Sequence, residues 1–231
     1  MSTSDAAPAV SRGKGLPTYV VLDVSKSMEA HEALLNKTLE EILETLYSNP
    51  RISEFIHLSI ITFSTRPHVV LGMTGISDLT GVPTVQCRGT TNFAPLFELL
   101  RERIDVDLQR LLATRITPLR PVVFLLTDGA PADRPYERWT EALSGLTDPS
   151  WKPHPHLITY GFGEAVESVL KQMSTVAAFI ADPRQGTNSE ALSSALASLL
   201  NSLVASVQAQ RLLVPEEVKG YRSLPLDPIE Y

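Results

Sequence analysis

Two aspartates in this sequence each follow a run of apolar residues. Asp23 follows TYVVL, and Asp128 follows PVVFLL and one threonine. A carboxylate beside a buried strand is costly to desolvate unless another group pairs with it. Ser25 and Ser27 come after Asp23 at alternate positions, so one bent loop can turn all three side-chain oxygens toward the same point. Carboxylate and hydroxyl oxygens, with no histidine or cysteine nearby in sequence, are the hard ligands that suit magnesium.

Strands and helices alternate along the chain and must position these side chains. Runs of β-branched and apolar residues predict strands at 18–22, 57–63, 67–71, 121–126, 157–160 and near 177–180. Apolar residues at helical spacing predict helices through 35–46, from a cap at Asn92 to Leu111, over 136–146, briefly after Gly163, and from Ser189 to about Gln210. The strands at 57–63 and 67–71 indicate a hairpin, and the glycine-rich segment 73–91 indicates an irregular surface segment.

This alternation predicts an α/β fold in three layers. We expect a doubly wound, mostly parallel central sheet with helices on both faces and one antiparallel edge strand from the hairpin. A sheet of this kind binds ligands at the carboxyl ends of its strands, which is where Asp23 and Asp128 fall. The 231 residues fit one domain over 17–210, with a flexible N-terminal tail at 1–16 and a proline-containing C-terminal tail at 211–231.

Three short motifs resemble those of one known family. Asp23-Val24-Ser25-Lys26-Ser27 resembles the Asp-x-Ser-x-Ser signature of von Willebrand factor A (vWA) domains, which have a Rossmann-like fold. In that family, a threonine from a second loop and an aspartate from a third complete a metal-ion-dependent adhesion site (MIDAS). GTTNF at 89–93 resembles the second loop, and TDG at 127–129 resembles the third. The resemblance implies that the metal ligands are Asp23, Ser25, Ser27, Thr91 and Asp128.

Two positions in these motifs leave alternatives open. Thr90 competes with Thr91, although Thr91-Asn92-Phe93 better matches the family's threonine-polar-apolar helix start. Lys26 stands where many relatives have glycine, and it adds a positive charge near the ion, which would weaken metal binding or attract an acidic partner.

Within the family, the sequence is similar to the bacterial TerY-like group, which is associated with tellurite resistance. The likeness rests on LPTYVVLD at 16–23, LSIITF at 58–63 and PVVFLLTDG at 121–129. It implies a protein-binding module that captures a Glu or Asp of a partner on Mg²⁺, with Mn²⁺ and Ca²⁺ as other ions. Movement of the Thr91 loop and of the final helix would couple the metal to the partner. The group is thought to act beside kinases and phosphatases in stress response or defence.

Two other classes of protein compete with a binding module. A Mg²⁺-dependent phosphatase-like enzyme would use Asp23 as a nucleophile, but such enzymes usually carry a second acid two residues later, where this chain has Ser25. With no evident nucleophile or general base, we expect no enzymatic activity. A scaffold with a vacant metal site would instead use Asp23, Ser25 and Ser27 only to cap a helix.

Composition argues against nucleic-acid and membrane partners and indicates a cellular location. The net charge of −6 disfavours nucleic acid, and runs such as 121–126 are far shorter than the ~20 apolar residues of a membrane span. The single cysteine, Cys87, allows no internal disulfide, and a cytoplasmic location is expected.

Three further polar side chains have competing interpretations. His154 and His156 alternate near a strand start, but without a third ligand we expect them to face solvent. Asp133 follows the third metal loop, where it either orients a metal-bound water or is a solvated loop acid.

Overall fold

The computed structural model describes residues 13–48, 50–79, 81 and 84–226. Its strands are β1 (Gly13–Asp23), β2 (Ile56–Phe63), β3 (Pro67–Gly75), β4 (Ile116–Pro118), β5 (Val122–Thr127), β6 (His156–Gly161), β7 (Ala177–Ala181) and β8 (Tyr221–Leu224). Its helices are α1 (Glu32–Tyr47), α2 (Pro50–Phe55), α3 (Ala94–Ala113), α4 (Arg138–Thr147), α5 (Glu167–Met173) and α6 (Asn188–Ala209), with 3₁₀ turns η1 (Lys26–His31) and η2 (Ile76–Asp78).

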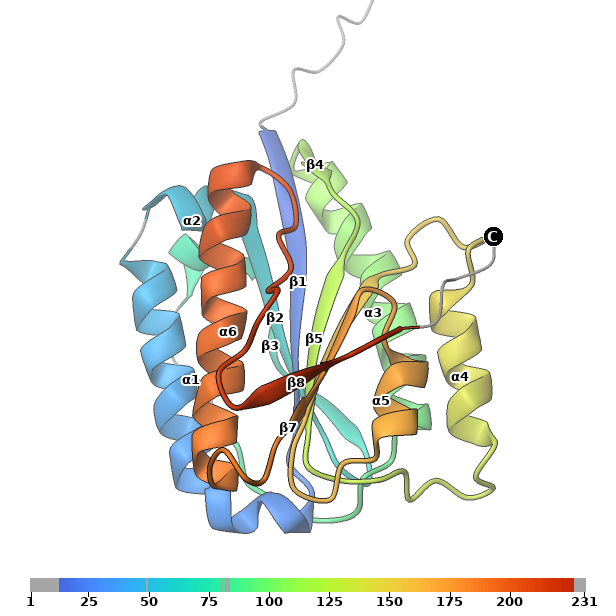
Figure 1. The fold of residues 1–231 in the computed structure, drawn as a ribbon. Helices are drawn as coiled ribbons and strands as arrows, with labels where there is room; N and C mark the ends of the chain where they lie inside the picture. The colour runs from blue at the N-terminus through green and yellow to red at the C-terminus, as the bar shows by residue number, and fades with distance from the viewer. Residues whose placement is uncertain (1–12, 49, 80, 82–83, 227–231) are drawn as a thin grey trace, which may run out of the picture.

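The strands form one sheet between two layers of helices (Figure 1). Their order is β3-β2-β1-β5-β6-β7-β8, and β4 pairs with the start of β1. Strands β1, β2, β5, β6 and β7 are parallel, while β3 pairs antiparallel with β2. The predicted three-layer, mostly parallel fold is therefore confirmed.

The sheet differs from the prediction at its edges. It has a second antiparallel edge strand, β8, which pairs with β7 at the edge opposite β3. β8 lies in the expected C-terminal tail 211–231, and its outer residues Tyr221 and Leu224 are buried while the two between them are exposed. β1 likewise begins at Gly13, inside the expected tail 1–16, because residues 13–15 pair with β4. Residues 1–12 and 227–231 of those tails lie outside the described residues.

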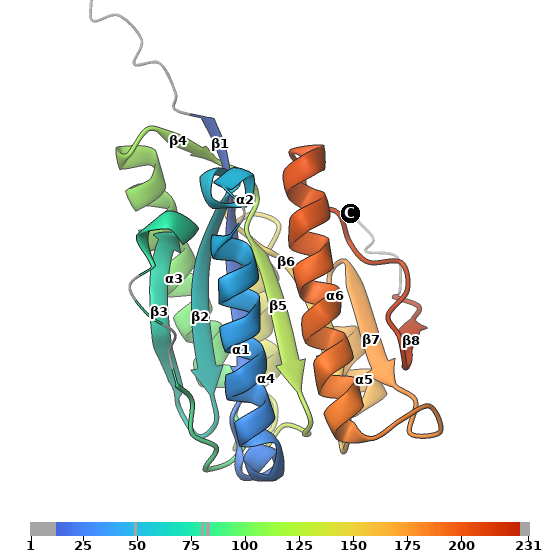
Figure 2. The ribbon, with the colours of Figure 1, turned by 90° about the vertical axis from the view of Figure 1, so that its left-hand side faces the viewer.

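Each face of the sheet has its own helices (Figure 2). Apolar side chains of α1, α2 and α6 pack with those of β1, β2 and β5 on one face, including Leu39, Leu199 and Phe124. On the other face, α3, α4 and α5 pack against the sheet, and Trp139 of α4 is buried there. Because helices cover both faces, every residue of β5 is buried.

The starts of α3 and α6 differ in how they are capped. α6 begins with a capping box in which the Thr187 hydroxyl accepts from the Glu190 amide, while the Glu190 carboxylate accepts from the Thr187 amide. The predicted cap of α3 by Asn92 is wrong. That helix starts at Ala94, its N-cap residue is Phe93, and Phe93 has no side chain that can accept a hydrogen bond.

The segment after α6 is tied to that helix by side-chain hydrogen bonds. The Ser202 hydroxyl donates to the Leu213 carbonyl, and the Leu213 amide donates to the Ser206 hydroxyl over 2.8 Å. Further along, the Tyr221 hydroxyl donates to the Ala191 carbonyl over 3.0 Å. The chain from 213 to 221 therefore runs back along α6 before β8 joins the sheet.

α6 is also the most apolar long helix in the described part of the chain. By length and composition it could cross a membrane, with a mean hydropathy of 1.3 over its best window, half of which is buried inside the protein. Serines interrupt its apolar residues, so the sequence shows no long apolar run. Buried core helices pass the same test, and α6 packs its leucines on the sheet.

Candidate functional site

The loop after β1 bends sharply around the Asp23 side chain. Asp23 is fully buried, and its Oδ1 accepts a hydrogen bond from the Ser25 amide over 2.9 Å. Its Oδ2 accepts from the Thr127 hydroxyl over 2.6 Å. Because Thr127 ends β5, the two neighbouring strands are joined at their carboxyl ends through one carboxylate.

A chain of hydrogen bonds continues from the β1 loop to the second aspartate. The Ser25 and Ser27 hydroxyl oxygens lie 3.0 Å apart, and the Ser27 hydroxyl donates to Asp128 Oδ1 over 2.8 Å. Asp128 is 5% exposed and directly follows β5. The structure thus brings together Asp23, Ser25, Ser27 and Asp128, which are up to 105 positions apart in the sequence.

Thr91, and not Thr90, faces this group. A β-carbon on Gly129 would lie only 3.0 Å from the Thr91 hydroxyl oxygen, so that hydroxyl lies against the backbone next to Asp128. The Thr90 hydroxyl instead lies 3.3 Å from that of Thr65 in an exposed position. All five candidate ligands therefore gather at one end of the sheet.

Backbone hydrogen bonds hold the first and second loops together. The Lys26 amide donates to the Gly89 carbonyl over 3.0 Å, and the Arg88 amide donates to the Val24 carbonyl over 2.7 Å. In the described chain, positive φ angles outside glycine occur only at Arg115 and Gln210. Lys26 therefore replaces the family's glycine without backbone strain, and its side chain is exposed.

The electrostatics of the group favour a bound cation. Burial raises the pKa of Asp23 from 3.8 to about 6, although hydrogen bonds from Thr127 and Ser25 oppose the shift and Asp128 adds to it. Burial also raises the pKa of Asp128, against the hydrogen bond from Ser27. Neither carboxylate forms a salt bridge within the described residues. Buried charges are normally paired or bound to metals, so two acids surrounded by hydroxyl oxygens fit a hard divalent cation.

The other polar candidates do not join this group. Burial and the nearby Glu32 raise the pKa of the Cys87 thiol to about 12, so it is an unreactive thiol. His156 begins β6 and lies at the opposite end of the sheet, and it is half-buried where we expected it to face solvent. No cluster of three His, Cys, Asp or Glu side chains suited to a metal occurs in the described ranges, so a metal here would depend on the hydroxyls.

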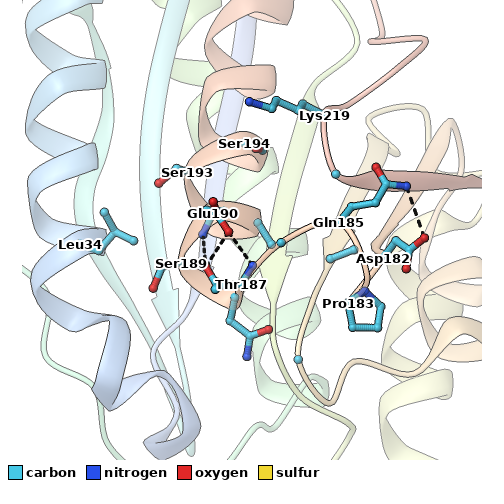
Figure 3. Close-up of a pocket in the computed structure, with 16 residues that line it drawn as sticks. Leu34, Asp182, Pro183, Gln185, Thr187, Ser189, Glu190, Ser193, Ser194 and Lys219 are labelled. Carbon is cyan, nitrogen blue, oxygen red and sulfur yellow. Dashed lines mark hydrogen bonds between the residues drawn. The ribbon is translucent and has the colours of Figure 1, made fainter.

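A cavity of about 420 Å³, whose lining Figure 3 shows, lies beside the group at Gly163. It is lined by the β7–α6 loop, the start of α6, and Gly163, Lys219 and Gly220. Gly163 lies next to Asp128, since a β-carbon on Gly163 would be 3.5 Å from that of Asp128. No motif in the sequence predicted this cavity. The only local signal was the Gly161-Phe162-Gly163 stretch, where Gly163 has a positive φ of 60°.

Comparison with solved structures shows that the fold is that of vWA domains. A von Willebrand factor type A protein from Catenulispora acidiphila superposes with a TM-score of 0.57 at 10% identity, covering 82% of this chain and 43% of that one. The pilus adhesin SpaC from Lactobacillus rhamnosus GG gives 0.64 at 12% identity over 84% of this chain and 30% of that one. Proximal thread matrix protein 1 from the mussel byssus, with a zinc-occupied MIDAS motif, gives 0.55 at 17% identity over 83% and 48%.

These likenesses establish the fold alone. This chain spans less than half the length of each of the three solved chains. No protein-family model matches the sequence, and no curated protein matches it.

Proposed function

We propose that this protein is a metal-dependent protein-binding module that captures an acidic side chain of another protein. The observation that carries the proposal is the continuous chain of hydrogen bonds from Ser25 through Ser27 to Asp128, beside a second buried acid, Asp23, that pairs with no basic side chain in the described part of the chain. The ligands would be Asp23, Ser25, Ser27, Thr91 and Asp128.

Each side chain has a distinct part in this proposal. The two aspartates balance the charge of a divalent ion, and the three hydroxyls turn their oxygens toward it instead of toward one another. A bound Mg²⁺ would supply the electrostatic attraction for an incoming carboxylate. Five side chains leave at least one place in a six-oxygen shell for a partner's Glu or Asp. The cavity beside Gly163 leaves room for the residues that flank that acid.

The choice of Mg²⁺, with Mn²⁺ or Ca²⁺ as alternatives, rests on the all-oxygen character of the side chains. The zinc-occupied MIDAS motif of the mussel protein supports a divalent ion on this fold. A pilus adhesin among the similar structures supports a binding role.

The geometry at Asp23 argues against the phosphatase alternative. The Asp23 side chain has no exposed surface, so a phosphate ester cannot approach its oxygens for nucleophilic attack. We therefore expect no magnesium-dependent turnover of a generic phosphate ester. Turnover that disappears in Asp23→Asn would replace the binding proposal with the enzymatic one.

We extend the proposal to a cellular role on the sequence resemblance alone. The likeness to TerY-like proteins supports a cytoplasmic role in a bacterial stress response or defence system, with a kinase or phosphatase as the partner. Identification of a partner retained only in the presence of Mg²⁺ tests this step.

Neighbouring threonines provide the sharpest test of the site. Isothermal titration should show Mg²⁺ binding to the wild type, and partner capture should be lost with EDTA, in Asp23→Ala and in Thr91→Ala. Thr90→Ala is the matched control, because it removes a hydroxyl one position away that contacts Thr65. It should leave both Mg²⁺ binding and capture intact. Capture that survives EDTA and Asp23→Ala would show that the partner docks elsewhere, as the scaffold alternative requires.

A further inference from the structure

Asp133 lies in the loop between β5 and α4, five positions after Asp128, and is 3% exposed. Its Oδ2 accepts a hydrogen bond from the Phe93 amide, and its Oδ1 accepts one from the Ala94 amide, both over 2.9 Å. Both carboxylate oxygens therefore face the start of α3. The interpretation of Asp133 as a solvated loop acid is therefore wrong.

This contact supplies the cap that α3 lacks. The N-cap residue Phe93 offers no side-chain acceptor, so an acid from another loop satisfies two of the free amides at the helix start. The negative charge also lies at the positive end of the helix dipole. The start of α3 is thus held by a residue about 40 positions away in sequence.

The same loop holds Thr91 directly. The Ala132 amide donates to the Thr91 carbonyl over 2.8 Å, which adds to the two bonds made by Asp133. Three hydrogen bonds therefore fix residues 91–94 to the loop that begins with Asp128. The Thr91 hydroxyl lies against Gly129, the second residue of that loop.

We propose that Asp133 is a positioning residue that sets how closely the Thr91 hydroxyl approaches Asp128, and so sets the affinity of the site for its metal. This inference rests on the proposed function for its effect on the metal, but not for its effect on the Thr91 loop. Asp133 is not among the proposed ligands, since its two oxygens accept hydrogen bonds from the Phe93 and Ala94 amides.

The first measurement needs no metal. In Asp133→Ala, amide hydrogen exchange of a peptide covering 89–94 should be about tenfold faster than in the wild type, because two amides lose a charged acceptor. Asp107→Ala is the matched control, since it removes a buried acid from α3 at a position far from the start of that helix. Unchanged exchange in Asp133→Ala would overturn the positioning role, whatever the protein does with metal.

The second measurement is Mg²⁺ affinity by calorimetry. Loss of a group that orients a metal ligand typically weakens affinity about 10–100-fold, so Asp133→Ala should fall in that range. Asp133→Asn keeps one acceptor and should lose less, and Asp107→Ala should bind as the wild type does. Full affinity in Asp133→Ala would overturn the inference.

A double-mutant cycle separates positioning from general damage. If Asp133 acts through Thr91, then Asp133→Ala should weaken Mg²⁺ binding far less in the Thr91→Ala background than in the wild type. Equal losses in the two backgrounds would refute it. If the wild type binds no Mg²⁺ while the exchange result holds, then the proposed function fails and the attachment of Thr91 by Asp133 stands.

Discussion

Replacing Asp23 with asparagine should make the metal-free protein more stable at neutral pH, although it removes a proposed ligand. Burial raises the pKa of Asp23 from 3.8 to about 6, so the folded protein favours the neutral side chain. Asparagine is neutral and nearly the same shape. Its carbonyl can accept from the Ser25 amide, and its amide group can donate to the Thr127 hydroxyl, which can rotate.

The size of the effect follows from that shift in pKa. A rise from 3.8 to about 6 corresponds to about 3 kcal/mol in the free energy of unfolding, fully expressed at pH 7. For a chain of this length, such a gain raises the melting temperature by about 6–12 °C. The folded state binds the proton more tightly than the unfolded state does, so the stability of the wild type falls as pH rises from about 4 to about 6. The difference between wild type and Asp23→Asn should therefore vanish near pH 4.

Thermal melts of both proteins in EDTA, at several pH values, measure this difference. Saturating Mg²⁺ should reverse the order, because binding at about 1,000 times Kd adds about 4.1 kcal/mol to the wild type and nothing to the variant, which exceeds the advantage of about 3 kcal/mol that the variant has without metal. Glu40→Gln, which removes an exposed acid on α1, is the charge-matched control and should shift neither curve. An Asp23→Asn protein that melts at or below the wild type in EDTA at pH 7 would refute the reasoning.

Three further predictions concern parts of the fold away from the site. Burial lowers the pKa of His156 to about 4, so the folded protein resists protonation of this side chain. The free energy of unfolding should therefore fall as pH drops from about 6.5 toward 4. Denaturant titrations of His156→Gln should show a smaller fall over the same pH range. The Tyr19 hydroxyl donates to the buried Asp107 over 3.1 Å. Asp107→Ala leaves that buried hydroxyl without its acceptor and should lower the free energy of unfolding by about 2–4 kcal/mol in chemical denaturation. Thr187→Ala removes the acceptor of the α6 capping box and should lower stability by about 1 kcal/mol in the same assay, whereas no change would show that the box is dispensable.

The sequence predicted the central elements because their signals are local. The apolar run at 121–126 is typical of a strand covered on both faces, and the leucines of α1 repeat at helical spacing. β4 and β8 carry no such signal, because each is only a few residues long. Each forms by pairing with a strand from another part of the sequence. α2 is six residues long and begins at Pro50, shortly after α1 ends at Tyr47, so it has no helical period of its own that the sequence could show.

At the site, too, local signals were predictive and contacts between distant residues were not. The types and spacing of its side chains pointed to a hard cation, and the choice of Thr91 over Thr90 agrees with where the two hydroxyls lie. The cap of α3 was mispredicted because its true acceptor, Asp133, comes from a loop about 40 positions further on, whereas Asn92 has its amide group 3.4 Å from the Thr65 carbonyl. No local pattern contains that information.

The attachment of the chain after α6 has a mechanical consequence. Hydroxyls of Ser202 and Ser206 hold Leu213, and Tyr221 reaches back to the Ala191 carbonyl near the start of the helix. α6 cannot slide along its axis by itself, because β8 and the segment before it would have to travel with it or let go. Any shift of α6 on ligand capture would therefore also move β8, the outermost strand of the sheet. A distance measured between a label just beyond Leu224 and a second label on α1 would change with that shift.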